Sequence, residues 1–132
     1  MIQKITCQET YDIRHKVMWP DKPLEYIKLK DDPKGIHYGY FIEDKLVSVI
    51  SVFITDNTAQ FRKFATLEAY QGKGYGSKLL THVLDSITSL DYIWCNARLE
   101  KTGFYEAFGM FKTDETFEKG GIDYIIMKKQ YK

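Results

Sequence analysis

Hydrophobic positions change their spacing along the chain, and each spacing predicts a different kind of element. In the first half, short apolar runs rich in β-branched and aromatic residues predict strands over residues 2–6, 37–42, 46–54 and 59–67. Polar turns at Glu43-Asp44-Lys45 and Asp56-Asn57-Thr58 separate the last three runs. The pattern therefore predicts an antiparallel meander in this part of the chain.

Helices are expected between the first strand and the second. Thr6 is placed to cap a helix over residues 8–18, which Pro20 ends. A second, shorter helix over residues 23–29 would begin on its proline, the favoured first position. Residues 30–35 have the composition of a loop.

The second half of the chain alternates helices and strands. Apolar residues recur at helical spacing over residues 75–89, and a buried strand over residues 91–96 follows. A helix over residues 99–108 ends at Gly109, because glycine adopts the C-terminal cap conformation easily. Strands near residues 111–117 and 122–128 complete the chain.

A strand, a helix and a strand in succession imply a right-handed crossover, with residues 59–67 and 91–96 parallel. The expected fold class is therefore α/β (α+β), with a mixed, mostly antiparallel central sheet of six to seven strands and flanking helices.

Composition describes a single compact domain over residues 1–132. Hydrophobic residues make up 44% and charged residues 28%, as in an ordinary globular protein. A formal charge of +1 argues against a nucleic-acid binder, and the 15% aromatic content argues against disorder. Two cysteines, Cys7 and Cys95, in no metal-ligand spacing favour a reducing cytoplasm. No signal peptide or membrane span is expected, and no metal or membrane partner.

The most informative segment is Gln71-Gly72-Lys73-Gly74-Tyr75-Gly76-Ser77, which joins a predicted strand to the long predicted helix. Three alternate glycines let the backbone turn successive amides toward one point, and a helix N-terminus favours an anion such as pyrophosphate. Lys73 and Lys78 can add positive charge nearby. The spacing fits neither a Walker loop nor a dinucleotide fingerprint.

The loop does fit [QR]-x-x-G-x-[GA], and the chain resembles the GNAT-type N-acetyltransferases nearly end to end. Phe64-Ala65-Thr66 before the loop and Phe104-Tyr105-Glu106-Ala107-Phe108-Gly109 after it extend the resemblance. It implies acetyl-CoA as cosubstrate. It also implies a bulged strand that splays from its parallel neighbour, so that pantetheine pairs with the backbone of Phe64, Ala65 and Thr66. Thr102 is a further expected contact to the cosubstrate.

The resemblance assigns Tyr105 the role of general acid, which protonates the departing CoA thiolate. The alternative is that Tyr105 only packs in an aromatic core. No general base is assigned: Glu68 could equally be a solvated loop residue, and His15, His37 and His82 each fit a structural or exposed role.

The closest branch in sequence is that of the small-molecule acetyltransferases related to glyphosate N-acetyltransferase. By that resemblance Arg62 and Arg98 face an anionic, amino-acid-like substrate, unless they pair with structural acids. Two positions depart from the branch: Trp19 replaces a basic residue and Tyr124 replaces a catalytic histidine. Together they suggest a more aromatic substrate pocket.

The sequence therefore predicts a cytoplasmic N-acetyltransferase that acts on the primary amine of a small, amino-acid-like or anionic metabolite. Two alternatives stay open: acetylation of a protein or peptide, and a non-catalytic acyl-CoA sensor. The chain is expected to be a monomer or a homodimer.

Overall fold

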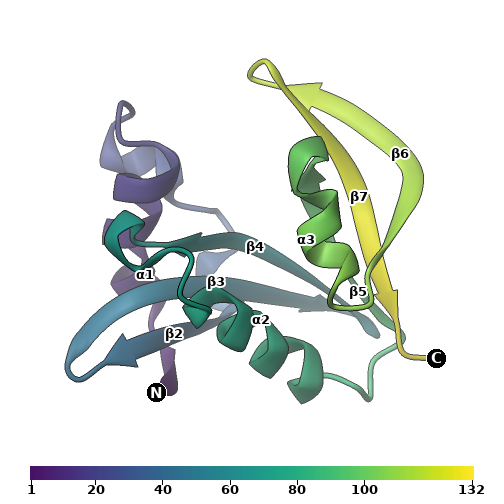
Figure 1. Ribbon diagram of the computed structural model, residues 1–132, viewed down its shortest axis with the longest axis horizontal. Coiled ribbons are helices and arrows are strands. Elements are labelled where there is room, and N and C mark those ends of the chain that lie inside the picture. Colours follow the sequence, from purple (N-terminus) through teal and green to yellow (C-terminus); the bar gives the residue numbers. More distant parts are fainter. The chain divides into compact units, whose positions relative to one another are not determined.

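The computed structural model describes residues 1–132 and contains one sheet of seven strands in the order β1-β2-β3-β4-β5-β7-β6 (Figure 1). The elements are β1 (Ile2–Ile5), α1 (Cys7–Ile13), η1 (Arg14–Met18), η2 (Leu24–Ile27), η3 (Asp32–Lys34), β2 (Ile36–Ile42), β3 (Lys45–Thr55), β4 (Thr58–Thr66), η4 (Glu68–Tyr70), α2 (Tyr75–Ser86), β5 (Tyr92–Arg98), η5 (Leu99–Lys101), α3 (Thr102–Glu106), β6 (Phe111–Lys119) and β7 (Ile122–Gln130). The predicted mixed, mostly antiparallel sheet is confirmed.

The chain divides into two compact units, which are described separately. Unit 1 comprises Met1–Phe53 and Phe61–Ser86, and unit 2 comprises Ile54–Gln60 and Ile87–Lys132. β4 contributes to both.

In unit 1, α1 begins at a capping box. The Thr6 side chain accepts a hydrogen bond from the Glu9 backbone, and the Glu9 carboxylate accepts one from the Thr6 backbone. The predicted helix over residues 8–18 does reach Met18, but its last turn, η1, is a π-helix. Trp19 ends it, one residue before Pro20.

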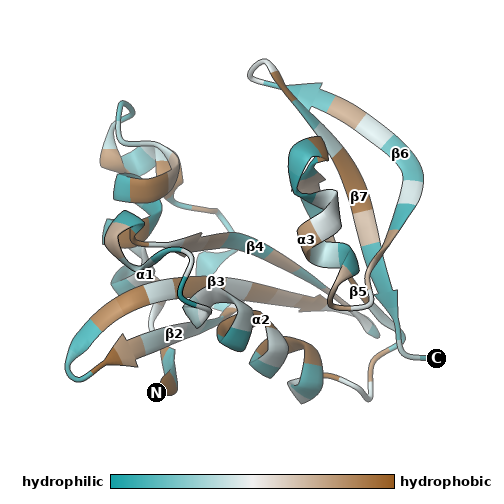
Figure 2. Cartoon of the chain, in the orientation of Figure 1, coloured by the Kyte–Doolittle hydropathy of each residue, from teal (hydrophilic) through white to brown (hydrophobic).

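The two faces of β2 and β3 are covered by different helices. Tyr38 points to the face of α2, where its ring lies 5.3 Å from that of His82. Val49 points to the opposite face, where it packs with Ile13 of α1 and Ala65 of β4. Because alternate residues of a strand face opposite sides, both faces of β3 are buried, and Figure 2 shows β3 as one of the most apolar ribbons.

Two helix predictions for unit 1 need correction. The segment expected to be helical over residues 23–29 is a short 3-10 turn, η2, with Pro23 as its N-cap. The long helix expected over residues 75–89 ends at Ser86, whose hydroxyl donates to the carbonyl of Val83. A side chain that bonds its own helix backbone in this way competes with continuation of the helix.

In unit 2, β5 pairs with β7 from Tyr92 to Arg98, and β7 pairs with β6 at the edge of the sheet. The helix expected over residues 99–108 consists of the 3-10 turn η5 followed by the short helix α3. Gly109 ends this helical segment with a φ of +86°, as predicted for a glycine cap.

The parallel pairing of β4 with β5 is short, in line with the splayed pair that the family resemblance implies. It covers only the pairs from Thr58–Tyr92 to Gln60–Trp94, although β4 continues to Thr66 and β5 to Arg98. Lys63 lies in the middle of β4 with a φ of +55°, which an extended strand does not accommodate. β4 is therefore bulged just beyond the point where its ladder with β5 ends.

Candidate active site

The glycine loop of unit 1 uses two of its glycines for backbone conformation. Gly72 and Gly74 have φ values of +76° and +88°, and a Cβ on either would meet no atom within 4 Å. Neither position is crowded, so glycine is needed there for the left-handed backbone rather than for space. The two residues reverse the chain immediately before α2.

Gly76 serves a different purpose, because it lies inside the first turn of α2 against β4. A Cβ at this position would approach the Thr66 hydroxyl oxygen to 3.1 Å and the Phe64 ring to 3.3 Å. The absence of a side chain therefore lets the helix N-terminus approach β4 closely. The backbone N–H of Lys78 donates to the Gly74 carbonyl and closes the first turn.

The amides at the start of any α-helix have no carbonyl of their own helix to bond, and they carry partial positive charge. In α2, a helix of 12 residues, they lie directly after the two left-handed glycines. The Gln71 side-chain amide donates to the Thr66 carbonyl at 2.9 Å and ties the loop to the end of β4. This arrangement fits a pyrophosphate group.

The end of β4 is held by β3. The Ser48 hydroxyl lies 2.7 Å from that of Thr66 and donates to the Ala65 carbonyl at 3.2 Å. The Leu67 amide donates to the Val47 carbonyl at 2.9 Å. These bonds fix the backbone of Phe64-Ala65-Thr66, the segment expected to pair with pantetheine.

Tyr75 and Tyr70 belong to an aromatic cluster beside the loop. The ring of Tyr75 lies 5.1 Å from that of Tyr40 and 6.3 Å from that of Tyr70. The ammonium groups of Lys45 and Lys73 lie 5.2 and 5.9 Å from the Tyr70 ring centre. The Tyr70 ring thus holds the ammonium groups of Lys45 and Lys73 beside the loop.

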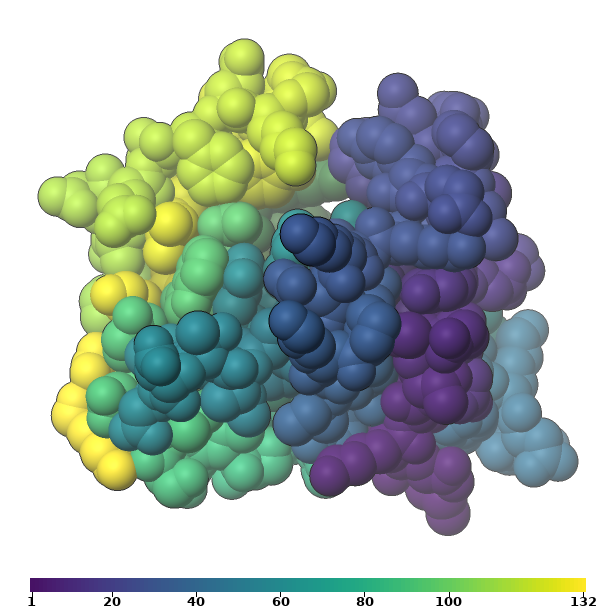
Figure 3. Space-filling view, turned by 180° about the vertical axis from the view of Figure 1, so that it is seen from behind, coloured from purple at the N-terminus to yellow at the C-terminus, as the bar shows by residue number.

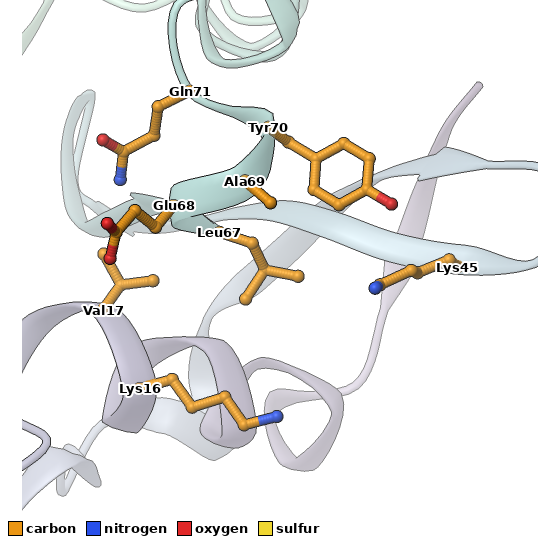
Figure 4. A pocket seen from close by; sticks show the side chains of 8 residues that line it. All are labelled: Lys16, Val17, Lys45, Leu67, Glu68, Ala69, Tyr70 and Gln71. Carbon is orange, nitrogen blue, oxygen red and sulfur yellow. The ribbon is translucent and has the colours of Figure 1, made fainter.

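A cavity of about 390 Å³ lies beside residues 67–71, the chain that follows β4 (Figure 4). Figure 4 shows side chains of η1 below it, the chain after β4 above it, and Lys45 to one side. The lining residues are Lys16, Val17, Lys45, Leu67, Glu68, Ala69, Tyr70 and Gln71. Of the candidate bases, Glu68 is the one that lines this cavity.

Two of the expected acceptor-binding residues lie in unit 1. Trp19 follows η1, and its ring meets that of Tyr26 edge-on at 5.2 Å. Arg62 is half-buried on β4, next to the bulge at Lys63. Arg62 forms no ion pair with a structural acid.

The other expected side chains lie in unit 2, where Arg98 and Tyr124 are brought together. They stand directly opposite each other in the β5–β7 ladder, and cross-strand partners point to the same face. Tyr124 in turn pairs with Phe117 of β6, and their rings are stacked at 5.2 Å with 14° between the planes. Sequence reasoning missed Phe117, because the register of β6 and β7 depends on a bulge between Lys112 and Thr116.

Tyr105 is half-buried on α3, with the ring of Phe104 edge-on at 5.2 Å. Burial raises the pKa of its phenol above the ordinary value. The buried thiol of Cys95 also raises this pKa, and Arg98 lowers it. The phenol is therefore protonated at neutral pH, as a proton donor must be. Thr102 begins the same helix, and its hydroxyl donates to the Leu99 carbonyl.

The three histidines occupy structural or exposed positions. His37 is buried in a hydrogen-bond network, and His15 bonds the Lys22 carbonyl at 2.6 Å. His82 is exposed on α2 with its ring against Tyr38. His15 and His37 each have a ring nitrogen in a hydrogen bond to the protein, and none of the three histidines lines the cavity beside residues 67–71.

Sequence reasoning also missed a buried ion pair between Arg14 and Asp32, whose side chains are 0% and 1% exposed. A signal was present: Arg14 follows the buried Ile13 and stands at helical spacing from Thr10 and Val17, on the inward side of its helix. A charged residue on that side needs a buried partner.

The chain has the fold of N-acyltransferases of known structure. The model of the acetyltransferase (GNAT) domain matches residues 3–131, and the chain belongs to the GNAT family. It is an N-acetyltransferase, and its cosubstrate is acetyl-CoA.

Known proteins agree with this assignment. An uncharacterized N-acetyltransferase of Bacillus subtilis (strain 168), YitI, is 31% identical over 97% of this chain and 94% of its own length. A putative N-acetyltransferase from Lactobacillus plantarum has a TM-score of 0.85 at 22% identity, covering 99% of both chains. A Bacillus subtilis acetyltransferase in complex with CoA has a TM-score of 0.75 at 20% identity, covering 98% of this chain and 97% of its own. The two structures share the fold.

None of the helices is both long and apolar enough to cross a membrane.

Proposed function

We propose that this chain transfers the acetyl group of acetyl-CoA to the primary amine of a small, anionic, amino-acid-like metabolite. We propose further that it does so in the cytoplasm as a single domain, either a monomer or a homodimer. The observation that carries the proposal is the loop before α2. Its two left-handed glycines and closely packed third glycine suit it to hold a pyrophosphate.

In this proposal each unit has its own task. In unit 1, the amides from Gly72 to Ser77 bind the CoA pyrophosphate, with Lys73 as a nearby charge, and the backbone of Phe64-Ala65-Thr66 pairs with pantetheine. A backbone N–H at Ala65 or Thr66 polarises the thioester carbonyl. In unit 2, Thr102 contacts the cosubstrate and Tyr105 acts on its sulfur.

The proposed reaction is direct transfer. The neutral amine attacks the thioester carbonyl carbon, so a carbon–nitrogen bond forms and a tetrahedral intermediate results. The nitrogen of this intermediate loses a proton to solvent water, the carbon–sulfur bond breaks, and Tyr105 gives its proton to the leaving thiolate. The resulting phenolate then takes up a proton from water. The protonated phenol described above supports this role, since a phenolate could not donate.

The proposed acceptor carries a negative group. Arg98 and Arg62 are its candidate partners, because a guanidinium can hold a carboxylate or phosphonate through two parallel hydrogen bonds. Trp19 and Tyr124 are proposed to bind the body of the acceptor. The likeness to the glyphosate N-acetyltransferase branch and the stacked Phe117–Tyr124 pair beside Arg98 support an anionic acceptor with an apolar part.

The decisive experiment is an assay of free CoA thiol released from acetyl-CoA in the presence of amino acids, aminophosphonates, polyamines and peptides. Turnover with an anionic small amine, with a raised KM in Arg98→Ala, is the expected result. Glu115→Ala, on the exposed part of β6, is a matched control that should keep the wild-type KM. Turnover with peptides alone would favour the protein acetyltransferase. A thermal shift with acetyl-CoA but no turnover with any amine would favour the sensor.

A further inference from the structure

The Arg14 guanidinium is completely buried and links four parts of unit 1. It lies on η1 and donates to both Asp32 oxygens of η3, at 2.8 and 2.9 Å. It also donates to the Ser51 hydroxyl of β3 at 2.8 Å and to the Ile27 carbonyl of η2 at 3.2 Å. Its Nε–H is buried without a protein partner. Such a charge is expensive to bury, so its partners have a definite structural role.

His37 and Ser51 extend the hydrogen bonds of the Arg14–Asp32 ion pair. The Asp32 carbonyl oxygen can only accept, so the His37 Nε2 atom, 2.9 Å away, carries a proton and donates to it. The His37 Nδ1 atom lies 2.7 Å from the Ser51 hydroxyl. The Ser51 oxygen accepts in turn from Arg14. Arg14, Asp32, His37 and Ser51 are therefore joined by a continuous set of hydrogen bonds.

The segment over residues 19–31 depends on these contacts for its conformation. Its side chains are exposed or half-buried except that of Ile27, which is completely buried. Figure 3 shows the segment, in indigo, at the surface of the molecule. Because Ile27 is its one buried side chain, the segment has no extended apolar contact. Short hydrogen bonds to its backbone hold it in place instead.

Three of these bonds reach the segment at separate points. Arg14 donates to the Ile27 carbonyl, and the Leu29 amide donates to the Asp32 carboxylate at 2.9 Å. Nearer its start, His15 contacts the Lys22 carbonyl. Trp19 and Tyr26, whose rings meet edge-on, lie in the part of the chain enclosed by these attachments.

We infer that Arg14, Asp32, His37 and Ser51 form a buried latch that positions the segment over residues 19–31 for binding the acceptor amine. The inference rests on the proposed function, in which Trp19 contacts the acceptor. These four are positioning residues, since none of them touches a substrate itself. Weakening the latch is expected to loosen the segment and to impair acceptor binding, with little effect on the acetyl-CoA loop.

The test compares two latch variants with one control. Ser51→Ala removes the hydroxyl contacts to Arg14 and His37 and leaves the ion pair intact, whereas Asp32→Asn removes the charge that balances Arg14. The control is Glu25→Gln, which breaks the exposed Glu25–Lys28 pair on the same segment. Backbone hydrogen exchange is followed in residues 19–35 and in α2, and KM is measured for the amine and for acetyl-CoA.

In Ser51→Ala, exchange in residues 19–35 should rise about tenfold while exchange in α2 stays within about twofold of wild type. KM for the amine should rise about tenfold and KM for acetyl-CoA by less than about twofold. Asp32→Asn should show the same pattern more strongly, and Glu25→Gln neither effect. Should Asp32→Asn fail to fold, Ser51→Ala decides the outcome.

An equal rise of hydrogen exchange in α2 would refute the positioning role of the latch, because the variants would then only destabilise unit 1 as a whole. An unchanged KM for the amine in a loosened segment would also overturn it. A wild-type chain that acetylates no amine would instead refute the proposed function, and hydrogen exchange would still decide whether the four residues hold the segment.

Discussion

Replacement of Gly74 by alanine separates the backbone requirement of the loop from its need for space. The φ of +88° is left-handed, and a Cβ there would meet no other atom within 4 Å. The penalty is therefore conformational alone. An L-residue in this region costs about 1–2 kcal/mol, so Gly74→Ala should lower the free energy of unfolding by about that amount. Urea denaturation followed by tryptophan fluorescence measures the change.

The same variant should bind CoA less tightly. If the loop relaxes to relieve the strain, its amides no longer converge on the pyrophosphate, and a loss of about 1.4 kcal/mol corresponds to a tenfold increase in Kd. Titration calorimetry with CoA measures this directly. Unchanged stability together with unchanged CoA affinity would refute the reasoning about this loop.

Gly103 provides the matched control. It lies in α3, its φ is not left-handed, and a Cβ there would likewise meet nothing within 4 Å. Gly103→Ala should therefore leave the free energy of unfolding unchanged or raise it by up to about 1 kcal/mol, because alanine favours a helix. A similar destabilisation of both variants would mean that the left-handed backbone is not the cause.

Four further predictions follow from the side chains. Tyr105→Phe should lower kcat about 100-fold while the Kd of acetyl-CoA stays the same, as single-turnover kinetics and calorimetry can show. Arg98→Lys should raise KM for an anionic amine but not for its neutral amide analogue, because the paired hydrogen bonds of the guanidinium are lost. Burial alone would raise the pKa of Asp32, but hydrogen bonds from Arg14 bring it below its ordinary value of 3.8. Its contribution to stability is therefore complete above pH 3.8 and is lost as the pH falls further, so an acid titration of Asp32→Asn should lack that part of the wild-type transition. Burial raises the pKa of the Cys95 thiol to about 12, so Ellman's reagent at pH 8 should react with it only after unfolding in guanidinium.

The local elements were largely predictable, because their signals lie within a few residues of each other. The turn containing Glu43 and the turn containing Asp56 both have the predicted place, and each of these residues adopts the left-handed backbone common in hairpins. The glycine cap at Gly109 was likewise predicted from its position alone. Short-range chemistry determines such features.

Features that depend on distant partners were harder to predict. Arg14 lies 18 residues from Asp32 and 37 from Ser51, so no local pattern shows where its charge is neutralised. The segment after Pro23 has helical composition, but its length and its attachments allow only a 3-10 turn. The family resemblance implied a bulge in β4, but nothing in the chemistry of Lys63 indicates that the bulge lies at this residue.

The edge strand β6 has a consequence for how the protein behaves at high concentration. Its nine residues are almost all exposed, and a strand edge of this length can recruit the edge of another chain. The strand is protected by charge and by shape: Lys112, Asp114, Glu115 and Glu118 lie along it, and the bulge before Thr116 interrupts the flat edge. Surface engineering that makes this strand more apolar or more regular would therefore turn a harmless edge into a nucleus for aggregation.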